Sequence, residues 1–230
     1  MNAHGPSAAS CPGGAATARN AAVLANYERL ARWYDALVDP FERRARAIAL
    51  RLLEPRAGEQ ILDIGCGTGA ALSELARAVG SSGRATGIDL SPRMAARAMD
   101  RLARADRGPN SLVTVAGVPP LPFDDGSFDA IFMSFTLEVI KPDSARAALL
   151  SECGRVLRRG GRMVCATVSG REPSAPASRL YRAAHRRFGS VVDCAPIRAA
   201  DVAASAGFVV TDRLELHLWG LPIDVIRVVR

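Results

Sequence analysis

Residues 61–69 read ILDIGCGTG, and this stretch indicates the fold of the chain. The apolar run at its start predicts a short strand, and the glycines let the backbone turn sharply where a Cβ atom would collide with a ligand. A helical pattern follows over 70–79, and the free N–H groups at its N-terminus favour a negatively charged group. The next strand, 84–88, is followed by Asp89, whose carboxylate can accept hydrogen bonds from both hydroxyls of a ribose. The stretch therefore predicts a nucleoside-binding site at a strand-to-helix turn.

Strands and helices alternate through most of the chain. Because helices separate most of the first five strands, these strands are expected to lie parallel, with helices on both faces of the sheet. The expected strands are 60–64, 84–88, 112–115, 128–133 and 162–167, the last after a turn at 158–161, and the expected helices are 70–79, 92–103 and 143–157. Two final strands, 209–218 and 223–229, are joined by a short link and are expected to pair antiparallel. The pattern predicts a doubly wound α/β fold with a mostly parallel, seven-stranded sheet.

The N-terminal region is expected to lie outside this sheet. Residues 1–19 are rich in Ala, Gly, Ser and Pro without periodicity, which predicts a disordered tail before a domain at 20–230. Helices are expected at 21–37 and 40–53, and together they are interpreted as a helical lid over 20–55.

A second addition is expected after the fifth strand. Residues 171–196 predict a helical insertion with an amphipathic helix at 173–188, and a further helix is expected at 197–206. Open α/β sheets bind ligands beyond the carboxyl ends of their strands, so this insertion is expected to select the substrate.

The composition favours a globular domain. Hydrophobic residues make up 49% of the 230 residues, and no apolar run approaches the roughly 20 residues that span a bilayer. The net charge is +7, but it comes almost entirely from scattered arginines, which disfavours a nucleic-acid partner. This charge would still attract anionic substrates, or weakly a membrane surface. The start of the chain does not resemble a secretory signal, so the cytoplasm is the expected location.

The cysteines indicate neither a metal site nor a disulfide framework. There are five of them, and they form no CxxC pair and no metal-type spacing. An odd count favours free thiols in a reducing compartment. Cys153 and Cys165 have apolar neighbours and are expected to be small core residues.

A dinucleotide-binding dehydrogenase is the main alternative for the glycine-rich turn. It also has glycines after a strand, but in the pattern G-x-G-x-x-G, whereas here Gly65, Gly67 and Gly69 alternate with other residues. That alternative also leaves Asp63 and the antiparallel C-terminal pair unexplained. A nucleoside with an amino-acid end fits better, because the helix N-terminus suits its carboxylate and Asp63 is placed to receive its ammonium.

Four motifs carry a resemblance to a known family. The stretches ILDIGCGTG, GIDLSPRM, LPFDDGSFDAIFMSF and VLRRGGRMV resemble the successive motifs of class I S-adenosylmethionine-dependent methyltransferases. More narrowly, they resemble the ubiquinone and menaquinone biosynthesis C-methyltransferases, over about residues 25–230. The resemblance implies a Rossmann-like methyltransferase sheet, S-adenosylmethionine as the cofactor and S-adenosylhomocysteine as its product.

The resemblance also implies a role for each matched residue. Asp63 and the turn residues Gly65, Cys66 and Gly67 would line the methionine end of the cofactor, and Asp89 would hold the ribose. The other implied contacts are Leu90 and Met94 beside the adenine, Ser134 near the sulfonium, and Tyr34, which would close over the cofactor. The other interpretation of the tyrosine is a core aromatic in an amphipathic helix.

Two departures from the family's pattern bear on function. The family usually has an acidic residue where this chain has Gly117, so adenine recognition is expected to rest on backbone groups around Val118. The family often has histidines where Glu138 and Val139 stand here. The acceptor chemistry is therefore expected to differ from that of the quinone enzymes.

The chemistry needs alignment more than proton donation. Methyl transfer from a sulfonium is an in-line displacement with a neutral leaving group. Carbon attack by a phenolic ring also needs the phenol deprotonated, and the candidate catalytic residues are Glu138 and His185, with Asp193 as a third. Each has another interpretation, because Glu138 could face solvent and His185 lies in an arginine-rich helix face.

The expected activity is methylation of a small-molecule acceptor, with a quinone-like or aromatic ring preferred. Methylation of oxygen, nitrogen or sulfur in another metabolite is an alternative. A cofactor-binding protein without transferase activity is a further alternative from a different functional class. The sequence does not indicate the oligomeric state.

Overall fold

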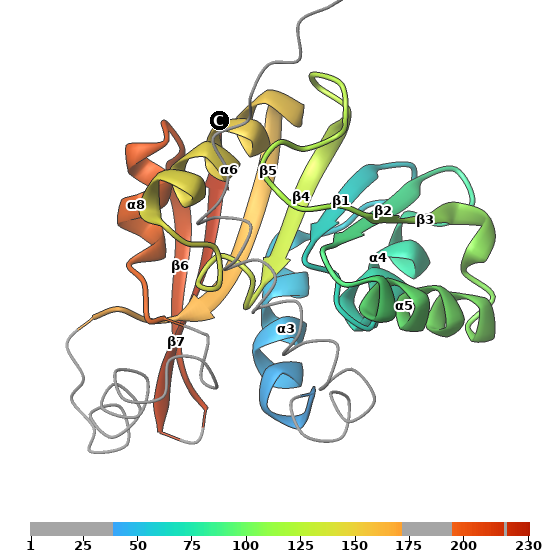
Figure 1. The fold of residues 1–230 in the computed structure, drawn as a ribbon, viewed down its shortest axis with the longest axis horizontal. Coiled ribbons are helices and arrows are strands. Elements are labelled where there is room, and N and C mark those ends of the chain that lie inside the picture. Colours follow the sequence, from blue (N-terminus) through green and yellow to red (C-terminus); the bar gives the residue numbers. More distant parts are fainter. Residues whose placement is uncertain (1–38, 172–194, 219) are drawn as a thin grey trace, which may run out of the picture.

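The computed structural model describes residues 39–171, 195–218 and 220–230, which build a seven-stranded sheet with helices on both faces (Figure 1). The strand order is β3-β2-β1-β4-β5-β7-β6. The first five strands pair in parallel, and β7 pairs antiparallel with both β5 and β6. The predicted doubly wound fold with an antiparallel C-terminal pair is confirmed.

The bounds of the elements follow the sequence patterns closely. The strands are β1 (Gln60–Ile64), β2 (Arg84–Asp89), β3 (Ser111–Val115), β4 (Phe128–Ser134), β5 (Leu157–Val168), β6 (Val209–Leu218) and β7 (Leu221–Val229). The helices are α3 (Asp39–Leu53), α4 (Ala70–Val79), α5 (Pro92–Arg104), α6 (Asp143–Val156) and α8 (Ala199–Ser205), with a short 3₁₀ turn at Gly108–Asn110.

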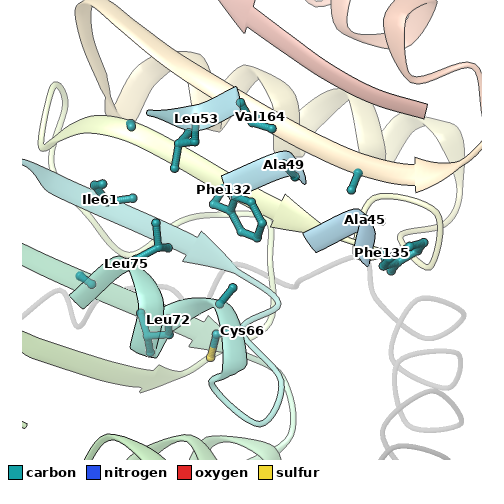
Figure 2. Packing of buried hydrophobic residues seen from close by; sticks show 14 of the residues in the cluster. Ala45, Ala49, Leu53, Ile61, Cys66, Leu72, Leu75, Phe132, Phe135 and Val164 are labelled. Atoms are coloured by element: carbon teal, nitrogen blue, oxygen red, sulfur yellow. The ribbon is translucent and has the colours of Figure 1, made fainter. Parts of the chain in front are cut away.

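Each face of the sheet has its own hydrophobic core. Apolar residues of α3, α4 and α5 pack with one set of strand residues, and those of α6 and α8 pack with the other. Figure 2 shows the first core, where Ala49 and Leu53 of α3 lie close to Phe132 and Val164. Successive residues of a strand point to opposite faces, so Ile61 belongs to the first core and its neighbour Leu62 to the second. By the same alternation Asp63 faces the helix α3.

The register brings the carboxyl ends of four strands to one edge of the sheet. Ile64 at the end of β1 is level with Ile88 of β2 and with Met133 of β4. Asp89 at the end of β2 is level with Val115 of β3. The segments that follow β3, β2, β1 and β4 therefore lie in that order along the edge, and this arrangement positions the site.

Two local predictions differ from the structure. The turn expected at 158–161 lies within β5 as an excursion, because Phe128 pairs with Leu157 and the next pair is Ala130 with Arg162. Gly160, at a φ of 77°, provides the backbone conformation that this excursion needs. The helix expected at 197–206 is shorter, because Ile197 forms a parallel bridge with Ser169 before α8 begins.

Several predictions lie outside the described residues. These are the disordered tail at 1–19, the helix at 21–37 and the helix at 173–188 within the expected insertion. The helix expected at 40–53 corresponds to α3. Within the described ranges, no helix is both long and apolar enough to cross a membrane. Cys66, Cys153 and Cys165 are buried free thiols.

Candidate functional site

A cavity of roughly 310 Å³ lies at the carboxyl edge of the parallel strands. Its walls come from the segments after β1, β2, β3 and β4 and from the start of α6. It brings together most of the residues that the sequence predicted for the cofactor: Gly65, Gly67, Asp89, Leu90, Met94, Gly117, Val118 and Ser134. The predicted ligand-binding edge therefore coincides with a cavity large enough for a sizeable part of a nucleoside ligand.

The turn after β1 is held by backbone hydrogen bonds to β2. The N–H groups of Gly65 and Cys66 both donate to the carbonyl of Ile88, over 2.8 Å and 3.1 Å. Gly67 and Gly69 have positive φ angles, and a Cβ atom added at Gly67 would meet nothing within 4 Å. The main chain of the turn therefore borders open space, as a close approach between backbone and ligand requires.

Asp89 is held in a fixed orientation by two backbone N–H groups. Its Oδ2 accepts from the N–H of Gly67 over 2.9 Å, and its Oδ1 accepts from the N–H of Ser91 over 2.8 Å. A carboxylate has about four lone-pair sites, so it can accept further hydrogen bonds from a ligand while it keeps these two. The position at the end of β2 and the cavity lining suit the hydroxyls of a ribose.

Asp63 lies beneath the turn and carries an unsatisfied oxygen. The residue is 2% exposed, and its Oδ2 has no hydrogen-bond partner among the described residues. Burial, reinforced by the nearby carboxylate of Asp89, raises the pKa of Asp63 to about 7, although Arg46 of α3 opposes the shift. A buried, unpartnered carboxyl oxygen is suited to accept from a cationic group such as an ammonium. This unpartnered oxygen is compatible with the ammonium-binding role that the sequence predicted for Asp63, although Asp63 is not among the described residues that line the cavity.

The segment after β4 contributes a second unsatisfied oxygen. Ser134 lines the cavity, and its buried Oγ has no hydrogen-bond partner among the described residues. The next residue, Phe135, has a φ of 54°, which is unusual for a residue with a side chain. Thr136 then anchors the segment, because its Oγ1 donates to the carbonyl of Ile64 over 3.0 Å. Strained backbone beside a ligand cavity is common at functional sites.

Two predicted site residues occupy different positions from those expected. Cys66 is 7% exposed and lies behind the turn, where its Sγ would be 2.9 Å from a Cβ atom added at Gly87. Glu138 is fully buried, so the alternative that its side chain faces solvent is wrong. It is also not among the described residues that line the cavity. Tyr34, His185 and Asp193 lie outside the described residues.

Glu138 links the segment after β4 to the end of β5. Its Oε1 accepts from the N–H of Val168 over 3.1 Å, and its Oε2 has no hydrogen-bond partner among the described residues. Burial is the main reason that the pKa of Glu138 is raised to about 8. At neutral pH the carboxyl is therefore mostly protonated. Glu138 is not among the described residues that line the cavity, so this arrangement does not place it in contact with a ligand there, as a general base must be.

Sequence reasoning missed the apolar wall opposite Asp89. This wall is formed by the segment after β4 and the start of α6, namely Phe135, Thr136, Val139, Ile140, Lys141, Pro142 and Ala145. Apart from Thr136 and Lys141 these residues are apolar, which is ordinary for a core, so no local signal distinguishes them. Ser91, whose Oγ caps α5 by accepting from the N–H of Met94, also lines the cavity.

Comparison with known proteins supports the same interpretation. Residues 61–161, which contain most of the cavity wall, match the family model described as a methyltransferase domain. The demethylmenaquinone methyltransferase of Tropheryma whipplei is 39% identical over 160 residues, which cover 67% of this chain and 63% of that protein. The chain belongs to the class I S-adenosylmethionine-dependent methyltransferases. Within that family its motifs resemble the menaquinone group, as the sequence indicated.

Other members of the family match more of the chain. The nocamycin O-methyltransferase of Saccharothrix syringae is 32% identical over 196 residues, which cover 85% of this chain and 66% of that protein. A Burkholderia thailandensis 1,6-didemethyltoxoflavin-N1-methyltransferase, solved with bound S-adenosylhomocysteine, has a TM-score of 0.68 at 17% identity, over 97% of this chain and 92% of that one. The structural likeness confirms the fold. S-adenosylmethionine, predicted from the motifs, is the cofactor of the family.

Proposed function

We propose that this protein transfers a methyl group from S-adenosylmethionine to a small-molecule acceptor with a quinone-like or aromatic ring. One observation carries the proposal. The fixed carboxylate of Asp89 and the unsatisfied carboxyl of Asp63 lie at the end of adjacent strands, and Asp89 borders a cavity with an otherwise largely apolar wall. That combination suits a ligand that carries a ribose, an ammonium and a flat base.

The residues of the chain would act mainly by positioning. When bound, S-adenosylmethionine supplies an electrophilic methyl group on a sulfonium. Asp89 would fix the ribose and Asp63 the ammonium, so that the methyl group has a defined direction. Ser134 ends β4, which pairs with β1, and together with the following residue Phe135 it would form the wall nearest the reacting atoms. Orientation of two reactants can contribute roughly 7–11 kcal/mol to a rate enhancement.

The names of the relatives favour a ring-bearing acceptor. One relative is named a demethylmenaquinone methyltransferase and another a nocamycin O-methyltransferase. The first match spans 63% of that relative's length, so its activity as a whole protein does not transfer directly. The apolar wall of the cavity is compatible with acceptors that are methylated on carbon, oxygen, nitrogen or sulfur.

Glu138 fits a positioning role better than that of a general base. It is fully buried and accepts from Val168, so it joins the segment after β4 to β5. In Glu138→Gln the amide can still accept that hydrogen bond, whereas Glu138→Leu removes it. If Glu138 positions the segment, only Glu138→Leu should lower the affinity for cofactor and the melting temperature. A loss of turnover with unchanged affinity in Glu138→Gln would instead support proton transfer, with His185 and Asp193 as the other candidates.

The proposed activity is tested by measuring S-adenosylhomocysteine formation. The full chain is incubated with S-adenosylmethionine and separate sets of quinols, phenols, thiols and amines. We expect product with at least one ring-bearing acceptor and none with Asp89→Ala at the same cofactor concentration. Product with thiols or amines alone would contradict the acceptor class. Calorimetric binding of S-adenosylhomocysteine without turnover of any acceptor would favour the cofactor-binding alternative.

A further inference from the structure

The cavity has two ends with different chemistry. Strand order places the segment after β3 at one end and the segment after β4 at the other, with β2 and β1 between them. The β4 end carries the unsatisfied oxygen of Ser134 and lies next to Asp63 of β1. The β3 end is lined by Leu90, Met94, Ala116, Gly117, Val118 and Pro119.

This order fixes the direction of a bound cofactor, if the proposed function holds. Asp89, at the end of β2, would take the ribose in the middle of the edge. The ammonium belongs with Asp63, one strand toward β4. The base must then extend the other way, toward β3, where apolar side chains suit the flat faces of a purine.

The β3 end offers little to the exocyclic amine of an adenine. That amine is a hydrogen-bond donor, which a backbone carbonyl can match and which a side-chain carboxylate or carboxamide oxygen can match more specifically. The described side chains that line this end include neither group. Sites discriminate strongly between ligands only when a buried polar group would be left unpaired with the wrong one.

We propose that the site binds the purine by its ring faces and by backbone groups, without a side chain that reads its exocyclic amine, and that position 117 is where this preference is set. Gly117 lines the cavity at the β3 end. Its φ lies outside the left-handed region, so the backbone does not require a glycine there. A Cβ atom added at Gly117 would lie 3.5 Å from Cδ1 of Leu90, an ordinary van der Waals distance. A side chain can therefore start at this position without a close contact at its Cβ atom.

The test compares two ligands by calorimetric titration of the full chain. One is S-adenosylhomocysteine, and the other is the analogue with hydrogen in place of the 6-amino group, which keeps the ring nitrogens. We expect the natural protein to bind them within about threefold of each other, because no charged acceptor is lost. Gly117→Asp should prefer S-adenosylhomocysteine by about tenfold or more, since a hydrogen bond to a charged group is strong. Gly117→Ala, which adds only the Cβ atom, should keep the ratio of the natural protein.

The possible outcomes separate this inference from the proposed function. A preference of about tenfold or more in the natural protein would show that the amine is already read, and would overturn the inference. An unchanged ratio in Gly117→Asp, with both ligands still bound, would overturn the placement of the base beside position 117. Failure of S-adenosylhomocysteine itself to bind the natural protein would overturn the proposed function, and this inference with it.

Discussion

The turn after β1 and the segment after β4 line the same cavity, but different kinds of contact hold them in place. In the turn, the N–H groups of Gly65, Cys66 and Gly67 donate to the end of β2, to the carbonyl of Ile88 and the carboxylate of Asp89. In the segment after β4, side chains make the contacts. Thr136 reaches the carbonyl of Ile64, and Glu138 accepts from Val168.

The difference explains how tolerant each region should be of substitution. Backbone hydrogen bonds in the turn depend on its conformation, which glycines at positive φ make accessible. The segment after β4 depends on the size and polarity of buried side chains, so conservative changes there should act through stability. The two regions meet where a Cβ atom at Gly65 would come within 2.3 Å of the Oγ1 of Thr136.

The largest effect is expected at Gly67. In Gly67→Val the side chain would enter the cavity, so binding of S-adenosylhomocysteine should become undetectable by calorimetry. Gly160→Val is the matched control, because Gly160 also has a positive φ and open space around it but lies in the β5 excursion. Both variants should lose similar stability from backbone strain, measured by thermal unfolding. Equal loss of binding in the two variants would mean that strain alone is responsible.

The next largest effect is expected at Asp89. Asp89→Ala removes hydrogen bonds to the ribose worth about 1.5–3 kcal/mol each, so the affinity for S-adenosylhomocysteine should fall about 100-fold or more. It also frees the N–H groups of Gly67 and Ser91, which loosens the turn. Asp212→Ala, an exposed aspartate on β6, should leave the affinity unchanged. An affinity of Asp89→Ala close to that of the natural protein would exclude Asp89 as the ribose ligand.

A smaller effect is expected from the titration of Asp63. Its pKa is raised from 3.8 to about 7, and the carboxylate form is the one that pairs with an ammonium. The affinity for S-adenosylhomocysteine should therefore fall about tenfold between pH 8 and pH 6. Calorimetry across this range checks it, and Asp63→Asn should bind weakly with a flat profile. A profile for the natural protein as flat as that of Asp63→Asn would remove Asp63 from the site.

The raised pKa of Asp63 also predicts that stability changes with pH, in the direction opposite to the change in cofactor affinity. Between pH 4 and pH 7 the folded protein keeps the proton that the unfolded chain has lost. The contribution of Asp63 to stability is therefore full below its unfolded pKa and is lost as the pH rises to about 7. Without ligand, the natural protein should lose stability relative to Asp63→Asn over this range, as measured by denaturant unfolding.

The smallest effect is expected where the two regions touch. Gly65→Ala would overpack against Thr136 and should destabilise the fold by about 1–3 kcal/mol. Thr136→Ala removes the two atoms that crowd the new methyl group most closely. A double-mutant cycle by denaturant unfolding should therefore show a favourable coupling of about 1 kcal/mol. Strictly additive effects would mean that Gly65 is needed only for its φ angle.

The parallel sheet could be predicted because its signals are local. The apolar run before Gly65 and the alternation of strands and helices each depend on neighbouring residues. The turn expected at 158–161 before a strand is instead an excursion within β5, because its glycines permit either arrangement. Pairing with β4 decides between the two, and that pairing joins residues far apart in the sequence.

The sequence by itself determined the turn after β1 and the carboxylate at the end of β2. The spacing of the glycines sets the turn, and the length of β2 sets the position of the carboxylate. Each of these features depends on a few adjacent residues. Only the tertiary structure decided that Glu138 is buried, that Cys66 packs behind the turn and that Asp63 titrates near pH 7. Burial and electrostatic shifts arise from the packing of distant segments around a side chain, and no local pattern records that packing.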